Sequence, residues 1–328
     1  SDISRTKIKE FTQNTDNVGR LLNGKYLVFM TSGSTGNPAV ILYDKTNIAV
    51  ASAISACRTF ARKQDYQAFR KNGRRTAGVF ACYGFYLACG MSRYMSLKMP
   101  FLKNKITIDV NASMEEIVNE LNSFNPVLLS GYPSNLSVLC EQQNNGELNI
   151  HPSVVITGGE QLTDSVRKQL ASTFGCYVQT HYSCTEAGEI ACECENGHLH
   201  INDDWVIVEA VDQNNNPVAD GTISHKILIT NLSNYIQPFI RYEVTDRVII
   251  HSEPCGCGKT SKWIEVEGRT DDILRFQNEV RIAPMSFYKI LEEIKEIKQF
   301  QLVQKKRDLL ELRIIADDRL SAFEIAKR

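Results

Sequence analysis

Strand–turn–helix units repeat through the middle of the chain, and they constrain its fold more than any other feature. Five short apolar runs alternate with helical patterns, at residues 76–82, 105–110, 127–130, 153–157 and 177–182. Ser113 and Glu116 have capping-box spacing before one helical pattern, and Thr163 precedes another that Gly175 ends. Thr46 is expected to cap an earlier helix that runs toward Arg62. Such units predict an α/β fold with a parallel sheet, in which ligands collect at the carboxyl ends of the strands.

The pattern changes twice toward the C-terminus. From about Trp205, short strands are separated by Asn/Pro/Gly turns, which predicts an appended antiparallel β region. Beyond residue 270, a helical pattern after Pro284 and a hairpin at 300–315 predict a small α+β unit. The predicted domains are therefore residues 1–270 and 271–328, with a hinge at Asp271.

Composition narrows the class of protein. The 328 residues are 43% hydrophobic, as in ordinary globular proteins, and a net charge of −1 gives no bulk attraction to nucleic acid or anionic membranes. No apolar run approaches the ~18 residues that span a bilayer, and residues 1–10 are too polar for a secretory signal. Ten cysteines in a chain of this length indicate a reducing compartment with mostly buried thiols. We therefore expect a cytoplasmic protein without nucleic-acid or membrane partners.

A loop rich in hydroxyl groups follows an apolar strand pattern at 26–30. Residues 31–38 read Thr-Ser-Gly-Ser-Thr-Gly-Asn-Pro, and a second strand pattern at 40–43 follows them. Glycine lets backbone amides approach phosphate oxygens closely, so such a loop can hold an anion. Taken alone, the stretch fits a solvent-exposed Gly/Ser connector better than an anion site.

Aromatic residues follow the strand pattern at 76–82. The sequence Tyr-Gly-Phe-Tyr at 83–86 can form the wall of a ligand pocket. Buried core aromatics are the alternative, and the residues alone leave both interpretations open.

Five segments resemble, in this order, the adenylate-forming superfamily of acyl- and aryl-CoA synthetases, luciferases and peptide-synthetase adenylation domains. The segments are the hydroxyl loop, Gly-Gly-Glu at 158–160, His-Tyr-Ser-Cys-Thr-Glu at 181–186, Arg-Tyr-Glu-Val-Thr-Asp at 241–246 and Gly-Arg-Thr-Asp-Asp at 268–272. Each is a weak match alone, but their shared order over nearly the whole chain is specific. The chain is most similar to the phenylacetate–CoA ligase branch. The resemblance implies a large multi-sheet N-terminal domain with an α+β C-terminal lid.

The resemblance also implies roles for single residues. The expected ATP-binding residues are Thr31, Ser32, Gly33, Ser34, Thr35, Gly36, Gly158, Gly159, Glu160, Tyr182 and Asp246. The hydroxyl loop would hold the β- and γ-phosphates, Tyr182 would stack on the purine, and Asp246 would accept hydrogen bonds from the ribose. The expected catalytic residues are Thr185 for the α-phosphate, Glu186 for Mg²⁺ and Arg269 for the ribose or phosphate.

The implied reaction is ATP-dependent activation of a small-molecule carboxylic acid as acyl-AMP, followed by thioester formation with CoA. By analogy, five residues would line the acid pocket: Tyr83, Phe85, Ser130, Gly131 and Tyr132. An aromatic lining favours an aryl or arylacetic acid. The alternatives are transfer of the adenylate to a carrier protein or reductase, or a non-catalytic homologue that binds a nucleotide or aryl acid. A homodimer is compatible with each of them.

The sequence departs from the family pattern at two places. Asn37 and Ala39 stand where the family usually has a lysine in or just after the hydroxyl loop, and Lys327 does not match the family's C-terminal lysine. We therefore assign no catalytic lysine. The segment after Asp271 is also shorter than the implied lid domain, so a truncated lid is expected.

Two short Cys/His clusters predict a metal site. The expected ligands are Cys194, His200, Cys255 and Cys257, which together could form a tetrahedral S₃N site for structural Zn²⁺. Cys192 and His198 are alternative ligands within the same segments. Buried reduced thiols without a metal are the other interpretation.

Overall fold

The computed structural model describes residues 3–31, 38–99, 103–269, 274–277, 281–282, 291, 294 and 297–316. The hydroxyl-loop residues Ser32, Gly33, Ser34, Thr35 and Gly36 lie outside the described residues. So do the expected hinge at Asp271, Lys327, and most of the helix expected after Pro284.

A nine-stranded mixed sheet forms the centre of the molecule, with strand order β14-β15-β10-β9-β8-β7-β6-β4-β5. The parallel strands are β4 (Thr76–Phe80), β5 (Lys105–Asp109), β6 (Leu128–Gly131), β7 (Val154–Gly158) and β8 (Tyr177–Cys184). The antiparallel strands are β9 (Gly188–Glu193), β10 (Leu199–Ile201), β14 (Asp246–His251) and β15 (Trp263–Arg269). The α/β class is confirmed, but much of the β-rich region extends the main sheet, because β9 already pairs antiparallel with β8.

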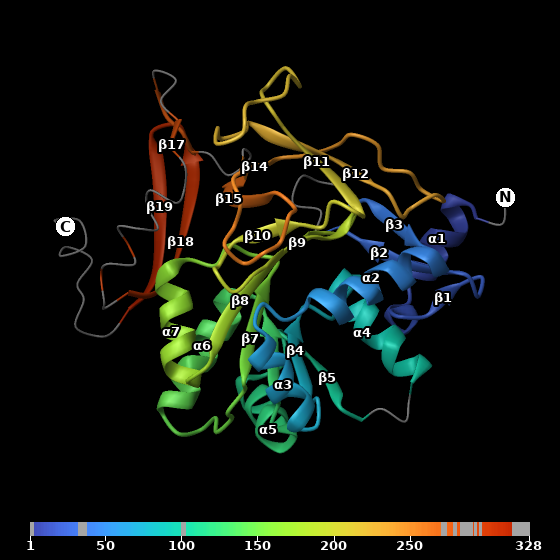
Figure 1. Cartoon of the computed structure of the whole chain (residues 1–328). Helices are drawn as coiled ribbons and strands as arrows, with labels where there is room; N and C mark the ends of the chain where they lie inside the picture. Colours follow the sequence, from blue (N-terminus) through green and yellow to red (C-terminus); the bar gives the residue numbers. More distant parts are fainter. Residues whose placement is uncertain are drawn as a thin grey trace.

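Helices cover both faces of the parallel strands (Figure 1). On one face, Leu129 and Val155 pack in a buried cluster with α5 (Met114–Phe124), α6 (Pro133–Asn144) and α7 (Asp164–Phe174). On the other, Leu128 and Val154 contact Phe60 and Phe69, which lie before and within α3 (Lys63–Lys71). Successive residues of β6 and β7 thus point to opposite faces, and both faces are buried.

Local sequence signals set the helix starts. Ser113 and Glu116 form the predicted capping box of α5, and Thr163 caps α7 as predicted. The expectation that Thr46 caps the helix after residue 43 was wrong. Asp44 caps α2 (Lys45–Arg58) instead, because its carboxylate accepts the backbone N–H of Thr46 at 2.9 Å. Among the described residues, no helix is both long enough and apolar enough to cross a bilayer.

The remaining elements form smaller sheets and their flanking helices. They are α1 (Arg5–Thr12), η1 (Thr15–Asn17), β1 (Leu21–Leu22), β2 (Tyr26–Met30), β3 (Val40–Tyr43), α4 (Leu87–Lys98), β11 (Val206–Val211), β12 (Lys226–Asn231), β13 (Tyr242–Val244), β16 (Leu274–Arg275), β17 (Arg281–Ile282), β18 (Ile297–Lys306) and β19 (Leu309–Ala316). β11, β12 and β13 form an antiparallel sheet, in agreement with the β-rich pattern. β18 and β19 form the predicted hairpin, drawn in red on the opposite side of the molecule from α1 in Figure 1.

The loop between β12 and β13 runs along the outer strand of the N-terminal sheet. The amide of Gln237 accepts from the backbone N–H of Leu42 at 2.9 Å and donates to the carbonyl of Val40 at 3.0 Å. Asn234 donates to the carbonyl of Leu42 at 3.1 Å. Two side-chain amides therefore occupy the edge of β3 and fasten it to the β11–β13 sheet.

The sequence predicts reduced cysteines, but two of them form a disulfide. Cys82 and Cys89 form a disulfide with a Cα–Cα distance of 5.5 Å, which is within the ordinary range for such bridges. It joins the end of β4 to α4. The other eight cysteines are free.

Candidate functional site

Three of the resembling segments meet beyond the ends of β7 and β8. Gly158 pairs with His181 in the parallel register of these two strands. The side chain of Gln161 donates to the carbonyl of Val266 in β15 at 3.1 Å, so the turn after β7 also contacts the antiparallel strands. The sheet therefore brings together segments that are distant in the sequence.

Tyr182, Asp246 and Arg269 form one contacting group. The hydroxyl of Tyr182 donates to Asp246 Oδ2 at 2.6 Å, and Arg269 Nε lies 3.6 Å from Asp246 Oδ1. Arg269 also donates to the hydroxyl of Thr245 at 2.9 Å. Burial, followed by the charge of Asp246, raises the pKa of Tyr182 well above its usual range, so the hydroxyl stays protonated as a donor.

Glu186 follows in the turn between β8 and β9, and it is only 7% exposed. Asn231 donates to its backbone carbonyl at 2.9 Å. Burial, followed by the charge of Glu186, raises the pKa of Tyr242 to about 12. Within the described part of the chain, no lysine or arginine is paired with this carboxylate. A buried carboxylate without a cation is costly, and a hard divalent cation such as Mg²⁺ prefers oxygen ligands of this kind. The donor set at Glu186 therefore fits Mg²⁺.

The hydroxyl loop is described only at its two ends. Thr31 accepts the backbone N–H of Ala39 on its hydroxyl at 2.9 Å, and its own N–H donates to the carbonyl of Ala39 at 3.0 Å. These bonds close the neck of the loop. They use one acceptor lone pair of the Thr31 hydroxyl, and its O–H remains able to donate to a phosphate oxygen.

The Gly-Gly-Glu turn is constrained by its neighbours. Gly159 has φ +77°, and a Cβ there would lie 2.9 Å from the ring of Tyr132, so only glycine fits without strain. The carboxylate of Glu160 accepts the backbone N–H of Ser134 at 3.1 Å in the first turn of α6. Glu160 thus satisfies a helix N-terminus, a contact that the sequence interpretation missed.

Two of the five expected acid-pocket residues are tyrosines with accessible rings. Tyr132 lies beside Gly159 and packs edge-on against Phe80 at 5.5 Å between ring centroids. Tyr83 is 58% exposed and packs edge-on against Tyr86 at 5.1 Å.

Two other expected pocket residues make contacts within the fold. Phe85 is buried in a hydrophobic cluster with Val28, which agrees with the core alternative for this aromatic residue. The hydroxyl of Ser130 donates to the carbonyl of Ala77 at 3.3 Å. Gly131, the fifth expected residue, allows close approach of the β4 backbone, because a Cβ there would lie 2.9 Å from a carbonyl oxygen of β4.

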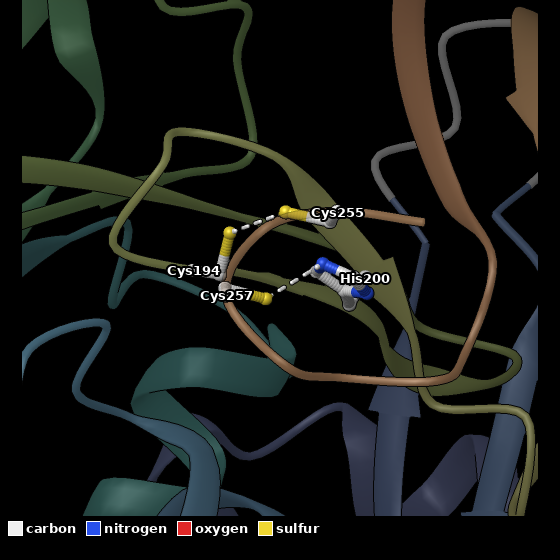
Figure 2. A group of neighbouring side chains, drawn as sticks. All are labelled: Cys194, His200, Cys255 and Cys257. Carbon is white, nitrogen blue, oxygen red and sulfur yellow. Dashed lines mark hydrogen bonds between the residues drawn. The ribbon is translucent and has the colours of Figure 1, made fainter. Parts of the chain in front are cut away.

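The four predicted zinc ligands converge on one point (Figure 2). Their donor atoms all lie within 4.8 Å of one another. The sulfurs of Cys194 and Cys255 are 3.6 Å apart, and Cys257 Sγ is 3.3 Å from His200 Nε2. His200 Nδ1 lies 2.9 Å from the carbonyl of Ser261, which fixes the proton on Nδ1 and leaves Nε2 facing the cluster. Ligands at about 2.3 Å from Zn²⁺ in a tetrahedron have sulfurs about 3.8 Å apart, so the set fits this metal.

The alternative ligands take other positions. His198 Nδ1 lies 3.2 Å from Cys255 Sγ, while its ring stacks on Trp263 at 3.9 Å. Cys192 instead neighbours His181 and Glu189, in a separate group. Burial raises the pKa of Cys255, but its histidine, cysteine and backbone neighbours have the larger, opposite effect and bring the pKa to about 5, so a thiolate is favoured.

Two residues that the sequence interpretation did not assign hold the turn at 185–186. Tyr43 donates to the carbonyl of Thr185 at 3.1 Å, and Asn231 donates to the carbonyl of Glu186 at 2.9 Å. Neither residue lies in one of the five resembling segments, so the sequence offered no signal for them.

Known proteins match the chain in sequence and in fold. Residues 22–222 match the family described as AMP-binding enzyme. The chain is 26% identical over 301 residues to a phenylacetate–coenzyme A ligase of Thermus thermophilus, covering 87% of this chain and 63% of that protein.

Two solved structures show the same fold. A 2-hydroxyisobutyryl-CoA ligase in the postadenylation state, in complex with 2-HIB-AMP, has a TM-score of 0.70 at 19% identity, covering 90% of this chain and 63% of its own. An anthranilate–CoA ligase in complex with anthranoyl-AMP has a TM-score of 0.62 at 12% identity, covering 92% and 59%. The chain thus spans less than two thirds of the length of these relatives.

Proposed function

Because the chain belongs to the AMP-binding enzyme family, we propose that it activates a carboxylic acid with ATP and transfers the acyl group to CoA. The observation that carries this proposal is the buried carboxylate of Glu186. It has no basic partner among the described residues. It lies in the turn that follows β8, the strand that carries Tyr182, and Tyr182 contacts Asp246. This arrangement combines a cation ligand with groups suited to a nucleoside.

The reaction has two steps. A carboxylate oxygen of the acid attacks the α-phosphorus of ATP and displaces pyrophosphate, which leaves acyl-AMP. The sulfur of CoA then attacks the acyl carbon, the thiol proton is lost, and AMP leaves. Both steps depend on positioning and on neutralisation of phosphate charge.

The chain's own residues supply the positioning. Asp246 has carboxylate oxygens that can accept ribose hydroxyls, and Tyr182 fixes the orientation of that carboxylate. The side chain of Arg269 is 42% exposed beside Asp246, so its guanidinium can reach a phosphate oxygen. Mg²⁺ bound at Glu186 would neutralise phosphate charge.

We propose an aryl or arylacetic acid as the substrate. The rings of Tyr132 and Tyr83 support this choice, as do the named acids of two relatives, phenylacetate and anthranilate. The aliphatic acid of the 2-hydroxyisobutyryl-CoA ligase is the natural competitor in any test.

Pyrophosphate exchange with a panel of aryl, arylacetic and short aliphatic acids tests the proposal. Acid-dependent exchange, with thioester appearing when CoA is added, is the expected result. Exchange without thioester would instead favour a carrier protein or reductase as acceptor. ATP binding without exchange for any acid would favour a non-catalytic homologue.

We also propose a structural zinc ion bound by Cys194, His200, Cys255 and Cys257. The proposal is supported by the donor atoms of these residues, which all lie within 4.8 Å of one another. The purified protein should contain about one zinc per chain, and Cys255→Ser should remove it and lower the free energy of unfolding by about 4 kcal/mol or more. Cys140→Ser, at a buried thiol outside the cluster, is the matched control. A Cys255→Ser protein that keeps its zinc would contradict the ligand set.

A cytoplasmic location is part of the same proposal. Eight cysteines outside the disulfide support it, because reduced cysteines persist in reducing compartments. The disulfide between Cys82 and Cys89 is the observation against it.

A further inference from the structure

Three loops line a cavity at the edge of the main sheet where β4, β6 and β7 begin. The loops are residues 72–75 before β4, 125–127 before β6 and 151–153 before β7, and the cavity between them has a volume of about 390 Å³. The three strands are neighbours in the sheet, so the loops meet although they are far apart in the sequence. A cavity of this size can hold a small molecule.

The cavity is separate from the nucleotide residues. It adjoins the residues before Val154, the first residue of β7, whereas Gly158 ends that strand. A strand of this length spans about 16 Å, so the cavity and the resembling segments lie at opposite edges of the sheet. A ligand held here would bind outside the site proposed for ATP and the acid, and the inference does not depend on the proposed function.

Arg75 supplies a fixed cation at the cavity. Its Nε donates to the carbonyl of Asn125 at 2.7 Å, and its Nη1 donates to the carbonyl of Asn72 at 3.1 Å. Both acceptors lie in loops that line the cavity. An arginine has five N–H groups, so these two bonds orient the guanidinium and leave further donors for a ligand.

The other polar side chains of the lining have no partner within the described part of the chain. No hydrogen bond joins the side chains of Asn72, Asn125, His151 and Ser153 to another described residue. The amides, the imidazole and the hydroxyl can therefore all donate to a ligand. The described residues of the lining include no carboxylate that would repel an anion.

The charge around the cavity is positive. Residues 66–108 contain eight lysines and arginines and no aspartate or glutamate, in a chain with a net charge of −1. Four of the eight lie at 70–75, and two more lie at 103 and 105, where β5 begins beside β4. None of the eight forms an ion pair with a described carboxylate. An anion at this edge would therefore meet positive charge that the fold leaves uncompensated.

We propose that the cavity is a binding site for a small oxyanion, in particular the phosphate group of a small phosphorylated molecule. The planar guanidinium of Arg75 matches two oxygens of one phosphate, and His151 and Ser153 offer further donors. A phosphate group with two negative charges gains more from the surrounding cations than a carboxylate with one. Nucleic acid strands instead bind along grooves that follow their backbone, and this cavity is confined to three loops.

The test is a titration with inorganic phosphate, followed by NMR of the ring C–H of His151 at constant pH and ionic strength. The chain has six histidines, and His151→Gln identifies the resonance of His151. Phosphate should shift this resonance saturably. Acetate at the same ionic strength should shift it less, which distinguishes a phosphate site from a general carboxylate site.

Three variants are compared by the same resonance. Arg75→Gln should weaken phosphate binding by about 10-fold, because a charge-assisted contact is lost. Ser153→Ala should weaken it by about 3-fold, and it removes a hydroxyl without a described partner, so it tests the site even if Arg75→Gln does not fold. Arg93→Gln is the matched control, at an exposed arginine of residues 66–108 outside the lining, and should leave the affinity unchanged.

Contrary outcomes are distinct. Wild-type phosphate affinity in both Arg75→Gln and Ser153→Ala, or an equal loss in Arg93→Gln, would overturn the site. An equal response to acetate and phosphate would overturn the preference for phosphate. A short oligonucleotide that shifts the His151 resonance at lower concentration than phosphate would overturn the small-molecule ligand in favour of nucleic acid. Pyrophosphate exchange tests the proposed function separately, so either proposal can fail alone.

Discussion

Two buried glutamates at the two ends of β9 have opposite surroundings. Glu193, at the end of β9, is 1% exposed and receives two hydrogen bonds from Arg167 at 2.9 and 2.8 Å. The hydroxyl of Tyr177 and the backbone N–H of Thr180 complete its partners, at 3.1 and 3.0 Å. Glu186, in the turn before β9, is 7% exposed, and no basic side chain among the described residues is paired with its carboxylate.

The contrast separates structural charge from charge kept for a ligand. A buried carboxylate with a charged partner adds little net stability, but removal of either partner destabilises the native state strongly. A buried carboxylate without a charged partner costs free energy, and a bound cation can offset that cost. Glu189 is an intermediate case, because it is partly exposed and pairs with His181, whose charge depends on pH.

The largest expected effect on stability is at Glu193. Glu193→Gln removes the charge facing Arg167 and leaves a half-buried guanidinium without its partner. We expect the free energy of unfolding in urea to fall by about 3–5 kcal/mol. Glu195→Gln, at an exposed position of the same region, should change it by less than about 0.5 kcal/mol. A loss at Glu193 as small as that control would contradict the structural role.

Glu186→Gln should show the reverse pattern. Pyrophosphate exchange should fall by about 10²–10³-fold, the size of effect seen when one charge-stabilising group is lost from a reaction. Stability should stay within about 1 kcal/mol of the wild type or rise, because an uncompensated buried charge has been removed. Intact exchange would refute Glu186 as the magnesium ligand. A loss of stability equal to that of Glu193→Gln would show that Glu186 has a structural role like that of Glu193.

The smallest expected effect depends on pH. Burial lowers the pKa of His181. The charge of Glu189 and its hydrogen bond raise the pKa by more than burial lowers it, so the pKa of His181 lies above its ordinary value. Stability from the charged pair is therefore fully present below the unfolded pKa of about 6.5 and is lost as pH rises through the folded pKa. Glu189→Gln should cost about 1 kcal/mol more at about pH 5.5 than at about pH 9, measured by urea unfolding. An equal cost at both values would show that His181 is not charged.

Local signals in the sequence were sufficient for most of the parallel half of the sheet. Apolar runs located β4 to β8, and Ser113 and Thr163 located the starts of α5 and α7, because caps and periodicity act within a few residues. The start of the helix after β3 was misplaced at Thr46, because two residues only two positions apart could each cap it, and the carboxylate of Asp44 does so.

The rest depended on contacts between distant segments. Cys255 and Cys257 could be grouped with Cys194 and His200 because metal ligands follow restricted types and spacings. In contrast, the side of the sheet that Phe85 faces follows from tertiary packing, which no local pattern encodes. The same holds for the contact of Glu160 with α6.

The loop between β12 and β13 has a consequence for the solubility of the folded chain. An outer strand with free N–H and C=O groups is a template on which a second polypeptide can add, and native proteins protect such strands. Gln237 and Asn234 supply, within the molecule, the partners that an incoming strand would otherwise provide to β3. The amides that connect two sheets therefore also guard the protein against association through this edge.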